Sequence, residues 1–524
     1  MRIESICIVG GGTSGWMAAA LLSKQHPDIE MVLIESPDIK PIGVGESTLA
    51  DFNRFLLRLG LKDEDWMTQC NATYKSSIRF KNFKEGKGES FQYPFGAFGP
   101  PRDETPFHIQ KYFEASWVYD YGSEEFARFV NPLTYPTEHG KISKEIPDSY
   151  YNPDTDLAYH LNADKFGEYL RDNIAIPNGC HHLIGEVHNV VKTPGGDISA
   201  ITTTDGQAIS ADLFIDCTGF RSLLLEQHMG VPFVSFEDQL FNDRALATHI
   251  EYKDKETQMD TYTDCVALGN GWVYNIPMWN NIGTGYIYSS KYISDAEAEK
   301  EFREYLDDQE CSLMPIKLKH GRHEKGWVNN VVGIGLSYGF IEPLESTGLV
   351  TTHDNIIFLD DILSTRDGHV VNQDRIAYNY ATNKLLESYK NFVVHHYTFS
   401  MREDTPYWRD ATNSVERFYK FTDNPHESSL HAIADYRQLL ESLETKVYDP
   451  NNGLGEGTIY IAAGMGYKPF TRTILNERAD EERFKEIEQY HNDYCKNKEH
   501  MLEWVNTLPS HYQYLKDNIY VESV

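Results

Sequence analysis

The sequence predicts an α/β fold in which a parallel sheet carries a dinucleotide at the carboxyl ends of its strands. Three apolar runs favour this fold. The first, at residues 6–9, leads into a glycine-rich turn and a helix-forming stretch. The second, at residues 31–34, ends at the acidic Glu35, and the third, at residues 213–216, has the same pattern of a buried strand. Strands that alternate with helices in this way are typical of a Rossmann-like sheet.

The glycine-rich turn has the sequence GGGTSG and fits the pattern G-x-G-x-x-G. Gly10 permits a tight turn, Gly12 lets the backbone approach a pyrophosphate, and Gly15 lets the following helix pack closely on the strand. The amino end of that helix favours the phosphate charge, and an acid at the end of the second strand accepts hydrogen bonds from ribose hydroxyls. The residues expected to bind the dinucleotide here are Gly10, Gly12, Thr13, Ser14, Gly15 and Glu35. The turn alone does not separate FAD from NAD.

The pattern along the chain predicts two modules. Residues 1–355 are expected to form the α/β module, with inserted sheet and loop segments. The remainder, residues 356–524, is mostly helical in pattern and is expected to bind the substrate.

Composition excludes several classes of partner. The chain of 524 residues has a net charge of −31, which argues against nucleic acid or an anionic membrane. Its seven cysteines are scattered and form no C-x-x-C pair, so neither a metal site nor a disulfide framework is expected. No apolar stretch reaches the ~18 residues of a spanning helix, and no signal peptide is expected. These features indicate a cytoplasmic enzyme.

Several motifs, in one order along nearly the whole chain, resemble those of flavin-dependent halogenases of the tryptophan-halogenase type. They are VGGGTSGWMA at residues 9–18, IGVGEST at 42–48, ATYK at 72–75, GWVYNIP at 271–277, WVNN at 327–330, FIEPLESTG at 340–348 and REDTPYW at 402–408. The resemblance implies a FAD-binding fold of the flavin monooxygenase type with a mostly helical substrate-binding cap. It also implies FAD, used as FADH2, and a halide ion as a substrate.

Further site residues follow from the resemblance. Gly43, Val44 and Gly45 fall in the strap that contacts the flavin. The turn Ser346-Thr347-Gly348 offers backbone N–H groups that could hold a halide, because turns of this kind form anion-binding nests. The chain has one nucleotide fingerprint and no second one for a nicotinamide, so we expect a separate flavin reductase to supply FADH2.

Two residues match the catalytic pair of the family, Lys75 and Glu345. On sequence alone Lys75 would be read as a lysine whose stem packs on apolar residues while its ammonium reaches the surface. The resemblance instead implies an ammonium that directs hypohalous acid, by hydrogen bond or as a haloamine. Glu345 could equally be an acidic residue of a helix start. The resemblance makes it a carboxylate near Lys75 that takes the ring proton or polarises the halogenating species.

The motif at residues 271–277 supplies Trp272, Tyr274 and Pro277. Alternation along a strand places Trp272 and Tyr274 on one face. Ordinary sheet packing would explain both, whereas the resemblance implies a wall that keeps the organic substrate away from the flavin. The family has a second tryptophan where this chain has Tyr274.

The expected substrate-binding residues depart from the tryptophan-specific pattern. In those members a histidine and a phenylalanine sandwich the indole, and here the matching residues are Tyr93 and Phe95. A further stacking tryptophan is absent from the matching stretch, which includes Gly453 and Leu454. We therefore expect free tryptophan to be a poor substrate and a range of electron-rich aromatic compounds to be accepted.

The resulting prediction is an enzyme that uses FADH2, O2 and halide to form hypohalous acid, which Lys75 and Glu345 direct onto a small aromatic substrate. The alternative is a flavin-dependent aromatic hydroxylase, and a non-catalytic flavin-binding protein is a third possibility. The stretch at residues 333–336 disfavours the hydroxylase, because it leads into the halide turn where hydroxylases have a Gly-Asp turn at the flavin. The preferred halide (chloride, bromide or iodide) and a homo-oligomeric state are left open.

Overall fold

The computed structural model describes residues 2–38, 45–96, 105–147, 149–307, 310–412, 454–467 and 479–521. The chain forms two compact units, each assembled from three separate stretches. Unit 1 comprises residues 1–72, 160–243 and 317–389, and unit 2 comprises residues 73–159, 244–316 and 390–524. The two units describe how the chain packs and do not show where a substrate binds. A substrate-binding module that begins after residue 355 therefore stays a prediction.

The largest sheet of unit 1 has six strands in the order β20-β21-β12-β1-β2-β8. All neighbours pair in parallel except β20 and β21. The expected α/β fold is confirmed, and the three apolar runs of the sequence become its central strands. The bounds are β1 (Ser5–Val9), β2 (Glu30–Glu35), β8 (His181–Ile184), β12 (Leu213–Asp216), β20 (Trp327–Val328) and β21 (Val331–Gly333).

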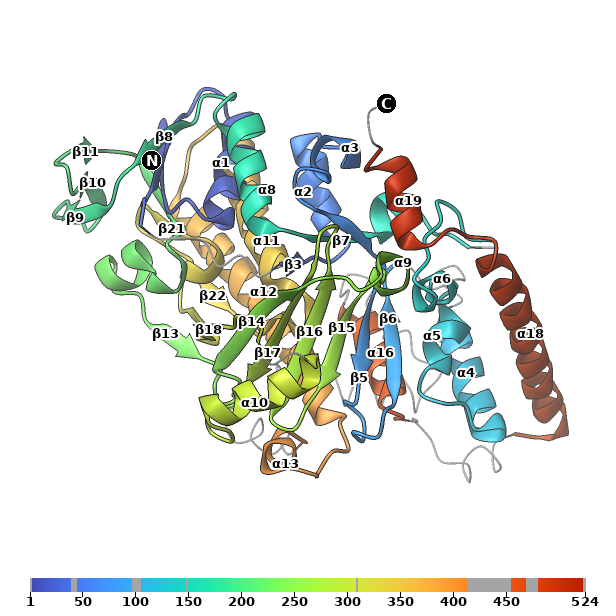
Figure 1. Cartoon of the computed structure of the whole chain (residues 1–524). Helices are drawn as coiled ribbons and strands as arrows, with labels where there is room; N and C mark the ends of the chain where they lie inside the picture. The colour runs from blue at the N-terminus through green and yellow to red at the C-terminus, as the bar shows by residue number, and fades with distance from the viewer. Residues whose placement is uncertain are drawn as a thin grey trace. The chain divides into compact units, whose positions relative to one another are not determined.

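Three helices of unit 1 pack together beside this sheet: α1 (Thr13–Gln25), α8 (Ala163–Leu170) and α11 (Thr347–Thr365) (Figure 1). The alanines at positions 18–20 are fully buried, and their small side chains allow close helix packing. Gly167 of α8 comes closest to the backbone of Thr13. The first turn of α1 is therefore packed closely against α8.

Unit 1 also contains short strands, short helices and most of one long helix. They are β3 (Glu46–Ser47), α2 (Phe52–Leu59), α3 (Asp63–Trp66), β9 (Val187–Lys192), β10 (Ile198–Thr203), β11 (Ala208–Ile209), β13 (Phe233–Ser235), β19 (Gly321–His323), β22 (Gly339–Phe340) and most of α12 (Asn372–Thr398). A short 3-10 turn, Pro343–Glu345, directly precedes α11.

Unit 2 contains a seven-stranded sheet in the order β18-β14-β17-β16-β15-β5-β6. Figure 1 shows α10 lying across this sheet, where Phe302 packs against Tyr286. The strands are β5 (Ser77–Lys81), β6 (Ser90–Pro94), β14 (Arg244–Ile250), β15 (Tyr262–Ala267), β16 (Gly271–Pro277), β17 (Ile282–Tyr288) and β18 (Met314–Lys317).

The remaining elements of unit 2 are mostly helical. They are β4 (Thr73–Lys75), α4 (Thr105–Tyr119), α5 (Glu125–Val130), α6 (Thr134–Glu138), α7 (Pro153–Asp156), β7 (Ala158–Leu161, at the unit boundary), α9 (Lys255–Gln258), α10 (Asp295–Leu306), α13 (Pro406–Thr412), α16 (Leu454–Gly464), α18 (Glu481–Val505) and α19 (His511–Asn518). Among the described residues, no helix is long and apolar enough to cross a membrane.

Candidate active site

The glycines of the N-terminal turn have distinct steric roles. Gly10 has φ +116°, and a Cβ there would lie 2.3 Å from the carbonyl oxygen of Cys217. A Cβ on Gly15 would lie 1.9 Å from the carbonyl oxygen of Gly10. At Gly12, by contrast, a Cβ would have no atom within 4 Å among the described residues. Gly10 and Gly15 are therefore required by the fold, whereas Gly12 faces open space.

The amino end of α1 begins at this open position. Gly12 has an extended backbone, no side chain of the described residues caps the helix, and the first turn contains no acid. The Thr13 hydroxyl donates to the carbonyl of Ala163 and so turns away from the helix end. Uncapped N–H groups and open space fit the pyrophosphate of a dinucleotide.

Glu35 ends β2, as the sequence predicts, and its carboxylate bonds to Nε2 of His182 at 2.8 Å. The carboxylate is about one-quarter exposed, with a side-chain exposure of 24%. It is thus oriented by the protein and still reachable for ribose hydroxyls. Sequence reasoning missed His182, because no pattern links residues 147 positions apart. Gly45 is described, with φ +77°, whereas Gly43 and Val44 lie outside the described residues.

The expected halide turn lies at the amino end of α11. Ser346 has the left-handed conformation, with φ 58° and ψ 36°, and its hydroxyl donates to the hydroxyl of Ser47 at 3.1 Å. Thr347 is buried, and its Oγ1 has no hydrogen-bond partner among the described residues. No side chain in the described part of the chain caps this helix. A buried hydroxyl beside uncapped N–H groups fits a small anion.

Glu46 reaches the same helix end. Its Oε2 is 3.7 Å from the position that a Cβ on Gly348 would occupy. Burial, with a smaller contribution from Asp164, raises the pKa of Glu46 to about 7. Below this pH the carboxyl is mostly uncharged and does not repel an anion at the amino end of α11.

A small pocket in unit 1 opens beside these groups. It is lined by residues 335–336, 339–341, 347–348 and 351–352. The pocket contains the expected halide residues Thr347 and Gly348 together with the stretch Gly335-Leu336. A Cβ on Gly335 would meet the side chain of Ser14, so the pocket wall contacts the dinucleotide turn within the same unit.

The two glutamates that precede α11 are both buried. Glu345 is the last residue of the 3-10 turn and is 1% exposed. Glu342, at the start of the turn, accepts a hydrogen bond of 2.6 Å from the side-chain amide of Asn242. The backbone carbonyl of Asn242 in turn contacts Nε2 of His320. The Glu342 side chain therefore helps to hold the turn that carries Glu345.

Lys75 is completely buried at the end of β4 in unit 2. Its Nζ lies 4.9 Å from the centroid of the Phe95 ring, a cation–π distance. The reading of Lys75 as a lysine that reaches the surface is wrong, because the ammonium itself is enclosed. A lysine that served only solubility would be exposed to solvent, so the complete burial of Lys75 indicates another role.

Hydrogen bonds hold the backbone on both sides of Lys75. The Thr73 hydroxyl donates to the carbonyl of Pro277 at 2.5 Å. On the other side, the N–H of Ser76 donates to the carbonyl of Thr261 at 2.6 Å, and Phe95 donates its N–H to Ser76 at 2.8 Å. Pro277 thus braces the lysine strand, a role that the sequence did not indicate.

Trp272 and Tyr274 are buried in β16, and their ring centroids are 6.3 Å apart. The strand pairs with β15 and β17 on its two edges. The Tyr274 ring lies over Gly285, where a Cβ would approach it to about 2.5 Å. Both rings therefore pack within the sheet of unit 2, and their role as a wall stays a prediction.

The rings of Tyr93 and Phe95 pack edge to face, with 6.2 Å between their centroids, but their other neighbours differ. Tyr93 belongs to an aromatic cluster with Tyr460, at 5.3 Å between centroids, and Phe392, at 6.1 Å. Phe95 lines a pocket in unit 2 whose other walls are Gly96, residues 131–133, residues 149–151 and Asp156. Phe95 thus contacts the Lys75 ammonium and also lines this pocket.

Little of the structure is described for the other two expected substrate residues. Gly453 lies outside the described residues, and only the backbone of Leu454, at the start of α16, is described. Gly457, which the sequence did not single out, packs closely against Tyr93 and Phe392.

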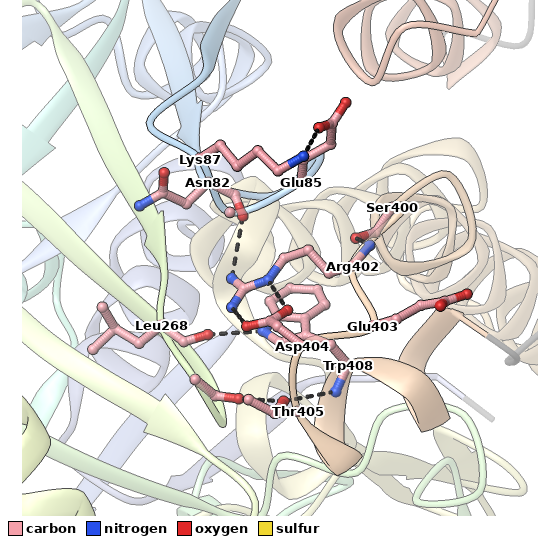
Figure 2. A network of polar contacts seen from close by, with 12 residues as sticks. Asn82, Glu85, Lys87, Leu268, Ser400, Arg402, Glu403, Asp404, Thr405 and Trp408 are labelled. Atoms are coloured by element: carbon pink, nitrogen blue, oxygen red, sulfur yellow. Dashed lines mark hydrogen bonds and ion pairs between the residues drawn. The ribbon is translucent and has the colours of Figure 1, made fainter.

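The family motif at residues 402–408 is a structural clamp (Figure 2). The Arg402 guanidinium bonds both carboxylate oxygens of Asp404, at 2.9 and 2.7 Å, and lies 4.3 Å from the ring centroid of Trp408. It also donates to the carbonyl of Asn82 at 3.2 Å. The indole N–H of Trp408 donates to the carbonyl of Leu268 at 2.7 Å. The motif therefore joins three separate stretches of unit 2 and carries no visible chemistry.

Comparison with known proteins gives consistent matches. A family model described as tryptophan halogenase matches residues 5–447. The tryptophan 6-halogenase of Streptomyces toxytricini is 35% identical over 432 residues, which cover 78% of this chain and 80% of that protein. The tryptophan 7-halogenase of Lentzea aerocolonigenes is 34% identical over 419 residues, which cover 78% of each protein.

Solved structures give similar matches. The apo structure of VirX1 has 45% sequence identity and a TM-score of 0.91, covering 99% of this chain and 100% of that one. The crystal structure of the Streptomyces toxytricini tryptophan 6-halogenase has 32% identity and a TM-score of 0.81, covering 98% of this chain and 99% of that one.

Proposed function

Because the chain belongs to the tryptophan-halogenase family and is a flavin-dependent halogenase, we propose that it forms hypohalous acid from FADH2, O2 and halide. Lys75 and Glu345 then direct the halogen onto an electron-rich aromatic substrate. The observation that carries the proposal is the fully buried Lys75, whose ammonium lies on Phe95 at the wall of a pocket. The hydroxylase alternative is not favoured, since the relatives above are halogenases.

The cofactor is FAD in its reduced form, which when bound supplies the activated oxygen that oxidises the halide. The uncapped N–H groups of α1 and the open face of Gly12 bind its pyrophosphate, and Glu35 accepts hydrogen bonds from its ribose. Gly43, Val44 and Gly45 complete the contact with the flavin. The halide lies at Ser346, Thr347 and Gly348, where the Thr347 hydroxyl and the backbone N–H groups donate to it.

The two catalytic residues act after hypohalous acid has formed. Lys75 either holds the acid by hydrogen bond or takes the halogen as a haloamine while water leaves. The halogen is transferred to a ring carbon, and Glu345 removes the proton of that carbon and restores aromaticity. Trp272, Tyr274 and Pro277 separate the organic substrate from the flavin.

The substrate is a small electron-rich aromatic compound, such as a phenol or an indole. Tyr93 and Phe95 contact it, and Gly453 and Leu454 belong to the glycine-rich stretch expected to bind it as well. The named relatives act on tryptophan, but here Tyr93 replaces the stacking histidine, and the further stacking tryptophan is absent. Loss of that tryptophan ring removes about 0.5–1.5 kcal/mol beyond the buried area. Free tryptophan is therefore a poor substrate, and phenols react ortho or para to the hydroxyl.

FADH2 comes from a separate flavin reductase, and the enzyme works in the cytoplasm. The chain has one nucleotide fingerprint, which FAD occupies. Purified protein mixed with FAD, NADH, O2 and halide should therefore oxidise NADH slowly until a reductase is added. Rapid NADH oxidation without a reductase would contradict this part of the proposal.

The complete proposal is tested with a halide-by-aromatic panel in the presence of a flavin reductase, read by mass spectrometry. Chloride, bromide and iodide are each combined with tryptophan, phenols, anilines and azoles in direct competition. We expect halogenated phenols and indoles in preference to halogenated tryptophan. A single tryptophan product at a ring position that solution chemistry disfavours would refute the substrate assignment, and hydroxylated products without halogen would refute the reaction.

A further inference from the structure

We propose that His511, on helix α19, is a positioning residue for Lys75. The inference rests on the proposed function of Lys75 and adds a residue from a distant part of the chain. His511 lies beyond residue 447, where the family model ends. Both residues belong to unit 2.

The imidazole of His511 is completely buried and uses both nitrogens. Its Nε2 accepts a hydrogen bond of 3.2 Å from the backbone N–H of Tyr74, the residue directly before Lys75. Its Nδ1 lies 3.1 Å from the carbonyl oxygen of Met259, to which it can only donate. The two partners therefore fix the tautomer with the proton on Nδ1, and the ring bridges β4 to the chain after α9.

This bond completes a series of contacts along the lysine strand. Thr73 is held through its hydroxyl and Ser76 through its N–H, and His511 holds the peptide of Tyr74 between them. The Tyr74 ring also packs against Tyr159 and Tyr514, at 5.8 and 6.2 Å between centroids. Fixing the backbone on both sides of Lys75 limits the directions in which its ammonium can point.

Helix α19 is itself anchored, so His511 is a firm support. The N–H of His511 donates to the carbonyl of Gly140 at 2.8 Å. The Lys141 ammonium donates to the carbonyl of Leu508 at 2.7 Å. At the far end of the helix, Tyr520 stacks on Trp279 with 3.8 Å between centroids and parallel rings. Two separate stretches of unit 2, at residues 140–141 and at Trp279, therefore hold the helix and the residues beside it.

The imidazole must stay neutral for this role, because a protonated Nε2 could not accept from Tyr74. Burial lowers the pKa of His511 to about 4, and the backbone of Met259 and Asp260 only partly offsets this. The nearby titratable groups are Tyr74 on β4, whose ring centroid lies 6.4 Å from that of the imidazole, and Asp260, whose own pKa burial raises to about 6. Tyr159 and Tyr514 pack on the Tyr74 ring. The acceptor at Nε2 is thus available throughout the neutral range.

The test compares His511→Asn with His511→Gln in the full-length FAD-loaded enzyme. Asn places its amide near the Nδ1 position, so it keeps a donor for Met259 but cannot reach Tyr74. Gln reaches the Nε2 position and keeps an acceptor for Tyr74. The measured quantity is the amount of halogenated product per FADH2 oxidised, since hypohalous acid that escapes a misplaced Lys75 is lost to solvent.

We expect the Asn variant to lose roughly 10–100-fold in this ratio, as small misplacements of a reacting group do, and the Gln variant to recover most of it. Leu515→Ala serves as control: it removes a buried side chain of the same helix and should lower the melting temperature without changing the ratio. Equal ratios for Asn and Gln would overturn the inference. If Lys75→Ala itself still halogenated, the proposed function would fail instead, so the two failures are distinguishable.

Discussion

The dinucleotide turn of unit 1 and the lysine strand of unit 2 are built in opposite ways. At the turn, Gly12 faces open space and no side chain of the described residues caps α1. At the strand, Lys75 is fully buried and the backbone beside it is held by hydrogen bonds from several distant segments. The first region needs room for a ligand, whereas the second needs contacts that fix one side chain. Added atoms should therefore damage the first region, and removed contacts should damage the second.

The largest effect is expected at the lysine strand. Lys75→Ala should abolish halogenation while bound FADH2 is still reoxidised by O2, because the proposed mechanism uses Lys75 only after hypohalous acid has formed. Lys75→Arg should also fail, since a guanidinium neither loses its proton nor carries a halogen as a simple amine does. Product yield by mass spectrometry and flavin absorbance measure the two steps separately. Lys87→Ala is the matched control, because the Lys87 side chain is 77% exposed; a normal product yield for Lys75→Ala would end the assignment.

Glu345 sharpens the comparison, because it is the proposed catalytic side chain of unit 1. Glu345→Gln should slow turnover by about 10²–10⁴-fold, the usual contribution of a general base, with the melting temperature nearly unchanged. Glu342→Gln offers a contrast: it replaces the carboxyl acceptor of the Asn242 hydrogen bond by an amide and should cost about 1 kcal/mol of unfolding free energy. Single-turnover rates and thermal melts of both variants provide the measurement. Wild-type turnover in Glu345→Gln would show that Glu345 only begins the helix.

Alanine substitutions at Gly12 and Gly15 test whether an added Cβ at the dinucleotide turn impairs FAD binding by filling space. Gly15→Ala would force a Cβ to 1.9 Å from the Gly10 carbonyl oxygen, so both folding stability and FAD binding should suffer. Gly12→Ala meets no described atom within 4 Å, so the melting temperature of the FAD-free protein should not fall, yet FAD affinity should. Thermal melts without FAD and a fluorescence titration with FAD separate the two effects. Unchanged FAD affinity in Gly12→Ala would place the pyrophosphate elsewhere.

The effect that should leave halogenation at neutral pH unchanged is a dependence of stability on pH that originates at His511. Its pKa is about 4 in the folded chain and 6.5 when unperturbed, so the unfolded chain takes up the proton first as the pH falls. The stability linked to His511 is complete above pH 6.5 and is lost progressively down to pH 4, by about 3 kcal/mol at ~1.4 kcal/mol per pKa unit. Urea unfolding at pH 7 and pH 4 should show the wild type losing this much more stability than His511→Gln. Parallel losses in the two proteins would contradict the assigned titration.

Local features of the fold were predictable from the sequence, and long-range features were not. The strand, turn and helix at residues 5–25 follow from hydrophobic pattern and glycine spacing, which act over a few residues. The burial of Lys75 was not predictable from its neighbours, since it depends on Phe95 and on segments far away. His182 and His511 escaped notice because their partners are 147 and 437 positions away in the sequence. The motif at residues 402–408 was recognised, but its role as a clamp emerged only from its folded contacts.

The position of His511 also has a consequence for the timing of biosynthesis. A ribosome that has made Lys75 must add more than 400 residues before His511 emerges, on the order of a minute at ordinary elongation rates. A chain released just before α19 would contain the nucleotide turn, the halide turn and the lysine, yet its Tyr74 peptide would lack the partner seen here. A helix that is translated long after Lys75 thus completes the support of the lysine strand, and a product terminated before His511 should release reactive halogen instead of transferring it.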